Sequence, residues 1–268
     1  MFSPAFIARY PGFIDLMGSV KMWRLWLRLG WMDILRRYRR TKIGPFWGTL
    51  SVGAFIGAMG FLYAGIFGQD PSEYIPYVAA GFAIWLPLST FVVESTSTFI
   101  TAENTIKHSA MPFTVFVWQA VIRNLIVFAH NLPIYVLVAV IFSVPLHINM
   151  LLVFPGLLLL LINAGWLGLV VSLICTRYRD VQQLVATIMQ MLFFVTPIFW
   201  QAGQAGRVRT IFVELNPAFH LVDIVRSPLL GIAPTQSSWL FVCGMGVGGW
   251  VFALAMFNRY RARVVLWV

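Results

Sequence analysis

Residues 36–67 read RRYRRTKIGPFWGTLSVGAFIGAMGFLYAGIF, and this stretch decides the class of the fold. Its second part, 46–67, carries no charged residue and is long enough to cross a bilayer as a helix, which takes about 20 residues. The apolar residues run continuously rather than alternating with polar ones, which favours a membrane helix over a barrel strand. The basic residues that precede this segment are typical of the cytoplasmic end of a membrane helix.

The composition of the whole chain agrees with this interpretation. Of the 268 residues, 60% are apolar and 10% are charged, whereas a soluble domain carries roughly 25% charged residues. The net charge of +10 would indicate nucleic acid in a soluble protein. Here the basic residues lie beside apolar segments, so orientation and contact with anionic membrane lipids explain them, and we expect no nucleic-acid partner.

Five further segments have the character of 46–67, so the sequence predicts an all-α polytopic membrane protein with six transmembrane helices. The predicted spans are 46–67, 76–99, 114–142, 150–174, 183–200 and 237–257. Residues 1–45 form a predicted cytoplasmic N-terminal region, and 46–268 form the transmembrane domain. Lysine and arginine are concentrated in the segments assigned to the cytoplasm, which predicts that both termini lie there.

The residue pattern at 13–40 predicts a helix that lies in the plane of the lipid headgroups and does not cross the membrane. Basic residues, among them Lys21, Arg24 and Arg28, occupy one side of the helical wheel, and tryptophans lie elsewhere on it. Gly30 is a candidate break in this helix. The simpler interpretation is an anchor that fixes the first span; the alternative is a cytoplasmic collar that contacts lipid-linked cargo. We favour the anchor, because interfacial helices exist without cargo.

Two segments between the spans predict short helices. The cytoplasmic loop 101–113 suits a short helix that acts as a lever for a soluble partner, although a solvated turn fits equally well. The outer segment 201–236 contains Asn216-Pro217, a helix start with a capping residue and proline at the first position. We expect a helix from Pro217 to Val225 that ends at Ser227-Pro228. It is too apolar to be freely solvated, so a half-inserted helix is expected.

Glu94 and Arg123 are ionisable residues within predicted spans. A central arginine costs about 2.5–3.5 kcal/mol on insertion scales, so it needs a partner or water. Both residues lie in the cytoplasmic halves of their spans, which one short loop connects. We therefore predict an ion pair near the inner leaflet; the alternative is a polar lining of a conduit.

Aromatic side chains gather toward the outer halves of the predicted spans and are candidates for a glycan conduit. Their faces offer sugar rings a non-specific stacking surface, although burial against neighbouring helices is the simpler interpretation for any one of them. The candidates are Tyr63, Phe67, Trp85, Phe193, Phe194, Phe199 and Trp200.

The sequence predicts neither a nucleotide site nor a metal site in this chain. The glycine-rich stretch 244–249 lacks the lysine and the serine or threonine that complete a phosphate-binding loop. The four histidines have no metal-ligand spacing, and no catalytic constellation is apparent.

A set of short motifs resembles the permeases of polysaccharide-export ABC transporters, which export O-antigen, capsule or teichoic-acid polymers. The motifs are RYRRTKIGPFW at 37–47, RYRDV at 177–181, TPIFW at 196–200, NP at 216–217, IVRSPLLG at 224–231 and YRAR at 260–263. Each motif is weak alone, but the set is fairly specific and extends over residues 37–263.

This resemblance implies a fold and a set of partners. It implies six spans, an N-terminal interface helix, a cytoplasmic coupling helix after the second span, and short outer gate helices between the fifth and sixth. It implies a homodimer in the bacterial inner membrane with a central conduit, bound to two copies of a separate ATPase that carries ATP and Mg²⁺. The cargo would be an undecaprenyl-diphosphate-linked polysaccharide, with O-antigen favoured.

The resemblance also implies roles for particular residues. The basic residues that would contact the diphosphate are Arg36, Arg37, Arg39, Arg40 and Lys42, which offer charge-assisted hydrogen bonds. The residues that would couple to the ATPase are Glu103, Lys107, His108, Met111 and Pro112. The outer gate would contain Asn216, Pro217, His220 and Pro228. We expect the chain not to be an enzyme.

Two other functional classes are compatible with a polytopic membrane protein. A membrane glycosyltransferase or acyltransferase needs acid and base residues at a membrane face, and the acidic residues here are few and scattered. An ion channel or secondary carrier usually has more intramembrane polar groups or internal repeats.

Overall fold

The computed structural model describes residues 10–39, 46–203, 206 and 210–268, and the elements within them are helical. Their bounds are α2 Pro11–Lys21, α3 Trp23–Tyr38, α4 Phe46–Phe67, α5 Pro71–Ser95, α6 Thr98–Thr101, α7 Glu103–His108, α8 Thr114–Ile141, η1 Ile148–Leu152, α9 Val153–Arg177, α10 Val181–Val195, η3 Thr210–Glu214, α11 Pro217–Leu229 and α12 Gln236–Trp267. The all-helical class predicted from the sequence is confirmed.

Five stretches of helix are long and apolar enough to cross a membrane: α4, α5, α8, η1 with α9, and α12. Helix α10 is apolar but has only 15 residues. The prediction that the fifth span continues to residue 200 is wrong, because the helix ends at Val195. The next residue, Thr196, has an extended backbone, which is the conformation favoured before a proline.

Other predicted boundaries shift as well; helix α5, for example, ends at Ser95 rather than at the predicted 99. Helix α5 begins at Pro71, before the predicted 76, because the Asp70 side chain caps it by accepting a hydrogen bond from Ser72 N. That bond lowers the pKa of the Asp70 carboxyl. Helix α12 continues past the predicted end at 257 to Trp267. Helix α11 does not end at Ser227-Pro228 but includes both residues and ends at Leu229.

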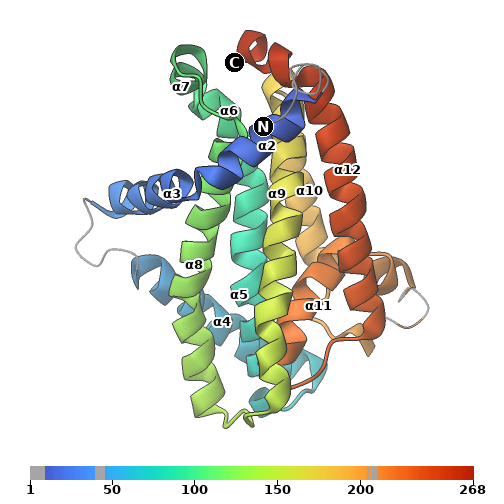
Figure 1. Cartoon of the computed structure of the whole chain (residues 1–268). Helices are drawn as coiled ribbons and strands as arrows, with labels where there is room; N and C mark the ends of the chain where they lie inside the picture. The colour runs from blue at the N-terminus through green and yellow to red at the C-terminus, as the bar shows by residue number, and fades with distance from the viewer. Residues whose placement is uncertain (1–9, 40–45, 204–205, 207–209) are drawn as a thin grey trace.

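The long helices run side by side, and the parts outside the bundle gather at its two ends (Figure 1). Helices α2, α6 and α7 lie at the same end as the C-terminus. The connections between α4 and α5 and between α8 and α9 lie at the opposite end, and α11 packs into that half of the bundle.

Helices α2 and α3 cross the bundle rather than extending along it (Figure 1). The chain changes direction at Met22, so Gly30 does not break the helix as the sequence suggested. Gly30 instead allows α3 to approach α8. A Cβ atom at Gly30 would lie 3.0 Å from Ile122 Cγ2 and 3.1 Å from the carbonyl oxygen of Gln119.

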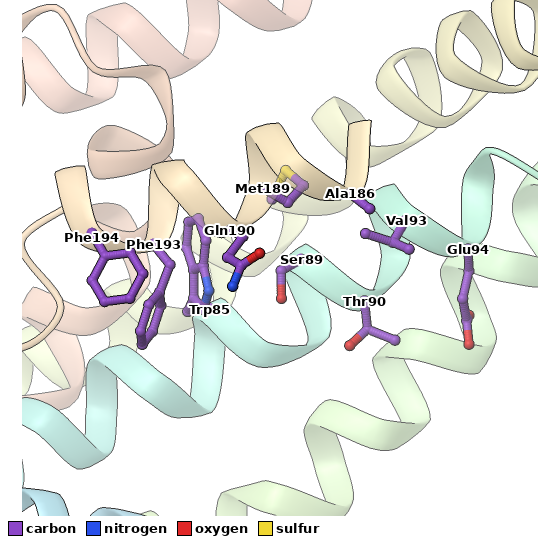
Figure 2. A pocket seen from close by; sticks show the side chains of 10 residues that line it. All are labelled: Trp85, Ser89, Thr90, Val93, Glu94, Ala186, Met189, Gln190, Phe193 and Phe194. Atoms are coloured by element: carbon purple, nitrogen blue, oxygen red, sulfur yellow. The ribbon is translucent and has the colours of Figure 1, made fainter. Parts of the chain in front are cut away.

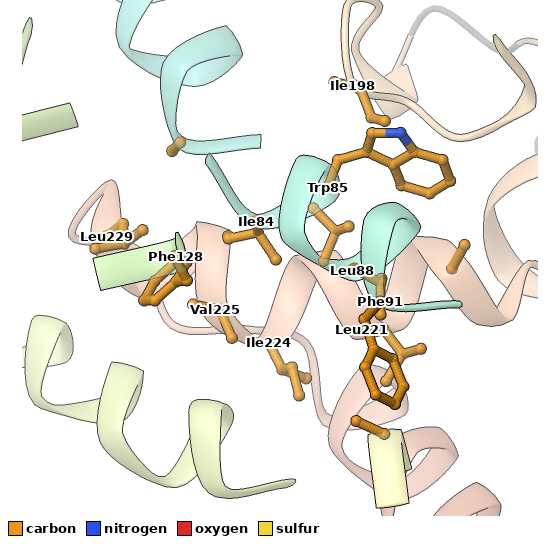
Figure 3. Close-up of a cluster of buried hydrophobic side chains, with 14 of the residues drawn as sticks. Ile84, Trp85, Leu88, Phe91, Phe128, Ile198, Leu221, Ile224, Val225 and Leu229 are labelled. Carbon is orange, nitrogen blue, oxygen red and sulfur yellow. The ribbon is translucent and has the colours of Figure 1, made fainter. Parts of the chain in front are cut away.

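The main hydrophobic core lies between α5, α8, α9 and α11. Figure 3 shows Ile84 and Leu88 of α5 beside Ile224 and Val225 of α11. Eleven of the 13 residues of α11 are buried, because the helix presents apolar side chains to several neighbours at once. Helix α11 is therefore part of the core rather than a helix lying against its surface.

Candidate functional site

Glu94 and Arg123, the pair expected from the sequence, are in direct contact. Arg123 Nη2 lies 2.8 Å from Glu94 Oε2, and Nε donates to the same oxygen at 3.0 Å. Helix α3 adds two further charges: Arg123 Nη1 lies 2.8 Å from Asp33 Oδ2, and Arg37 Nη2 lies 2.7 Å from Glu94 Oε1. These four residues form an inner charge network that connects α3, α5 and α8.

Neutral side chains complete the inner charge network. Asn124 Nδ2 donates to Glu94 Oε2 at 2.9 Å, and Gln119 Nε2 donates to Asp33 Oδ2 at 2.8 Å. Asp33 was not singled out from the sequence, although an acidic residue inside a basic helix was a signal of a partner. Because Asp33 and Arg37 are four residues apart, they lie on the same face of α3.

A polar cavity of about 800 Å³ lies against the inner charge network. Arg36 and Arg37 of α3 line it, together with Thr98 and Thr101 from the α6 region and Met111. It therefore brings two of the residues proposed to contact a diphosphate together with one proposed to couple to an ATPase. Arg39 is exposed at the end of α3. Arg40 and Lys42 lie outside the described residues.

A second cavity of about 480 Å³ lies between α5 and α10. Figure 2 shows the aromatic side chains Trp85, Phe193 and Phe194 at one end and Glu94 at the other. Polar side chains lie between them, namely Ser89, Thr90 and Gln190. We call this cavity the α5–α10 groove. Glu94 lines both cavities, so the groove and the polar cavity share this residue.

The structure brings together all seven aromatic residues proposed for a conduit. Phe199 is central: its ring centroid lies 5.4 Å from that of Tyr63 and 5.3 Å from that of Phe193. Phe67 stacks on Tyr63, Trp85 contacts Phe193, and Phe194 contacts Phe193.

The Trp200 indole donates to the Phe194 carbonyl at 3.1 Å. Trp85 is buried, whereas the Phe194 side chain is 68% exposed, so the cluster reaches from the core to the surface.

The proposed lever consists of α7 and the connection that follows it. Lys107 and His108 are exposed, and Lys107 Nζ lies 2.6 Å from Glu103 Oε1. This hydrogen bond lowers the pKa of the Glu103 carboxyl. Met111 and Pro112 lie in the connection to α8. Helix α7 projects from the end of the bundle that carries the C-terminus (Figure 1).

Asp15 ties the lever connection to both ends of the chain. Its fully buried carboxylate accepts hydrogen bonds from Phe113 N and Thr114 N, each at 3.0 Å, at the start of α8. Arg261 Nε of α12 donates to the same carboxylate at 2.7 Å. Asn258 of α12 in turn accepts from Gly12 N at 2.7 Å. None of these contacts was predicted from the sequence.

The residues proposed for an outer gate lie in α11 or directly before it. The Asn216 side chain caps α11 by accepting from Ala218 N at 3.0 Å, and its Nδ2 donates to Thr196 Oγ1 at 3.1 Å. Pro217 is the first residue of α11, and Pro228 lies in its last turn. His220 is buried, with Nδ1 3.0 Å from Ser238 Oγ. These residues hold α11 in place between the end of α10 and the start of α12.

Arg226 is a second charge centre that sequence reasoning missed. Its guanidinium is buried, donates to the Pro197 carbonyl at 2.5 Å and to Tyr77 Oη at 2.9 Å, and lies 4.5 Å from the Tyr77 ring centroid. Tyr77 Oη also donates to carbonyls of the segment after α10, and Tyr74 Oη bonds to the Phe199 carbonyl. Arg226 and these tyrosines therefore fix the non-helical segment 196–200 against α5.

Comparison with known proteins agrees with this arrangement. The sequence pattern of the ABC-2 type transporter family matches residues 24–230. The chain is also 22% identical over 193 residues to the O-antigen export system permease protein RfbA of Myxococcus xanthus, an alignment that covers 71% of this chain and 74% of that protein. Because the family match covers most of the chain and the structure supplies five apolar helices of spanning length, this multi-pass membrane protein belongs to the ABC-2 type transporter family.

Proposed function

We propose that the chain is the transmembrane permease of an ABC exporter that moves a lipid-linked polysaccharide, most simply O-antigen, across the bacterial inner membrane. The observation that carries this proposal is that the polar cavity and the α5–α10 groove share Glu94 as a lining residue. A charged headgroup and an aromatic-lined path for its glycan would thus have adjoining sites. The similarity to an O-antigen export permease supports the same cargo.

Six membrane crossings and cytoplasmic termini are part of this proposal. Helices α9 and α12 both end at the end of the bundle that carries α7 (Figure 1). Between them the chain has to return to the opposite end, and α10 and α11 would supply that return. Helix α10 would be a short crossing, completed by the fixed segment 196–200 and by α11. The distribution of basic residues assigns the α7 end to the cytoplasm.

The α5–α10 groove has the chemistry of a sugar path. Trp85, Phe193 and Phe194 offer flat apolar surfaces, and Ser89 and Gln190 offer groups that hydrogen-bond to hydroxyls. The groove is open on one side, and the Phe194 side chain is largely exposed. A second copy of the chain would close the groove, so the active form is proposed to be a homodimer with a conduit between its subunits.

The lipid-linked diphosphate would be received at the polar cavity. Arg36 lines the cavity without an ion pair to any described residue, and Arg37 contacts Glu94 through its Nη2 atom. Guanidinium groups bind phosphate oxygens through parallel N–H donors. Arg39 and the neighbouring Arg40 and Lys42 would extend this basic surface at the membrane boundary.

Power would come from two copies of a cytoplasmic ATPase that holds ATP and Mg²⁺. Helix α7 is exposed and projects from the proposed cytoplasmic end, which suits a contact with such a subunit. Motion of α7 would reach α2, α8 and α12 through Asp15. At the outer side, α11 and the segment 196–200 would restrict leakage between transport strokes.

Co-purification followed by an ATPase assay tests the proposal. The chain should purify with a separate ATPase subunit, and ATP hydrolysis by the reconstituted complex should increase when lipid-linked glycan is added. Phe193→Ala should reduce this stimulation, whereas Phe252→Ala, at an exposed residue of α12 that does not line the groove, should not. A partner-free enzymatic activity of the purified chain would refute the proposal.

A further inference from the structure

The α5–α10 groove is lined almost entirely by uncharged side chains. Helices α4, α5 and α10 and the segment 196–200 carry the aromatic cluster and the groove. They contain no lysine or arginine within residues 46–67, 71–95 and 181–200. The charged side chain that lines the groove among the described residues is Glu94, at its inner end (Figure 2). A chain of sugars entering the groove would therefore pass a carboxylate and then meet neutral side chains.

The arginines closest to the groove are already paired. Arg123 contacts the carboxylates of both Glu94 and Asp33, and Arg37 contacts Glu94. At the outer side, Arg226 is buried and donates to Pro197 and Tyr77. The Arg123 and Arg226 guanidinium groups are held by other partners, and Arg36 and Arg37 line the polar cavity rather than the groove. A polymer in the groove therefore meets no positively charged lining residue in the described part of the chain.

This charge distribution discriminates between classes of glycan. Moving an anion out of water into an aromatic-lined space is unfavourable unless a cation or several hydrogen-bond donors compensate it. A polymer with an acid in every repeat would meet this barrier repeatedly, because none of the described residues that line the groove is a cation. A neutral glycan keeps its stacking and hydrogen bonds and does not meet this barrier.

We infer that the groove selects for uncharged glycans: the polymer is built of neutral sugars, and its negative charge is confined to the lipid diphosphate. This inference rests on the proposed export function. It excludes polymers with a uronic acid, a sialic acid or a phosphodiester in each repeat, and it thereby separates a neutral O-antigen from acidic capsules and teichoic acids.

The test compares two lipid-linked glycans that share lipid, length and linkages but differ in one sugar per repeat, a hexose or the corresponding hexuronic acid. The complete exporter, with its ATPase, is reconstituted in proteoliposomes, and translocated glycan is measured together with ATP hydrolysis. We expect the acidic glycan to be exported about tenfold more slowly, because a modest increase in the activation free energy of transport slows the rate by this factor.

A matched pair of variants locates the selectivity in the groove. Gln190 lies between the aromatic end and Glu94 (Figure 2). Gln190→Lys places a cation in the groove and should reduce the preference for the neutral glycan several-fold, whereas Gln190→Met, similar in length but neutral, should not. Equal export of both glycans by the unaltered protein would overturn this inference and leave the proposed function standing. Export of neither glycan, without stimulation of ATP hydrolysis, would overturn the proposed function itself.

Discussion

Arg123 holds the inner charge network together, because it contacts carboxylates on two different helices, Asp33 and Glu94. Arg123→Glu would place three carboxylates together and leave Asp33 without its cation, while Arg37 would still contact Glu94. Breaking a largely buried ion pair costs about 3–5 kcal/mol, so we expect a loss near the lower end of this range. Detergent-induced unfolding measures it. Lys107→Gln, which removes an exposed pair, should leave the stability nearly unchanged. Equal costs for the two variants would contradict the network's role.

The Asp15 carboxylate accepts hydrogen bonds from backbone N–H groups and also pairs with the Arg261 guanidinium. Asp15→Ala removes the acceptor for Phe113 N and Thr114 N and leaves Arg261 unpaired. We expect a loss of about 3 kcal/mol, because a helix cap and a buried ion pair disappear together. Asp15→Asn keeps one carbonyl acceptor and should lose less. If Ala and Asn are equally damaging in unfolding measurements, the backbone hydrogen bonds contribute little.

At the scale of elements, α9 and α12 approach each other through a glycine. Gly249 of α12 faces the indole of Trp166 so closely that an added Cβ would overlap it, whereas Gly248 has nothing within 4 Å of an added Cβ. Gly249→Ala should therefore lower stability by about 1–3 kcal/mol through overpacking, and Gly248→Ala should be close to neutral. A thermal unfolding comparison of the two purified variants decides the point; a larger loss for Gly248→Ala would contradict the packing.

The segment 196–200 is ordered by tertiary hydrogen bonds rather than by its own helix. Tyr77→Phe keeps the ring but removes the hydroxyl that bonds to the Pro197 and Trp200 carbonyls and to Arg226. We expect a loss of about 1–3 kcal/mol from unsatisfied buried groups, with faster hydrogen exchange in residues 196–200. Tyr178→Phe, at an exposed tyrosine, is the control. Unchanged exchange in the Tyr77 variant would show that other contacts hold the segment.

At the scale of the whole molecule, the orientation in the membrane can be tested with single cysteines on a background without Cys175 and Cys243. Asn104 of α7 and Ile232 after α11 are exposed at opposite ends of the bundle. Asn104→Cys should react with an impermeant maleimide only in inside-out vesicles. Ile232→Cys should react only in preparations whose outer face is accessible. Labelling with the opposite sidedness would reverse the proposed topology.

The sequence alone determined the helical class, four of the span positions to within a few residues, the aromatic candidates and the contact between Glu94 and Arg123. These features depend on local apolar length and on the cost of an unpaired charge in lipid, both of which are readable along the chain. It misplaced the end of α10, because an apolar run across Thr196-Pro197 resembled a continuing helix.

Only the tertiary structure decided which distant groups meet. Asp15 and Arg261 are 246 residues apart, and Arg226 and Tyr77 are 149 apart, so no local pattern connects them. The sharing of Glu94 between the polar cavity and the α5–α10 groove likewise depends on how α3, α8 and α10 pack around α5. Hydrophobic length selects the helices, whereas side-chain packing and the pairing of buried polar groups select their neighbours.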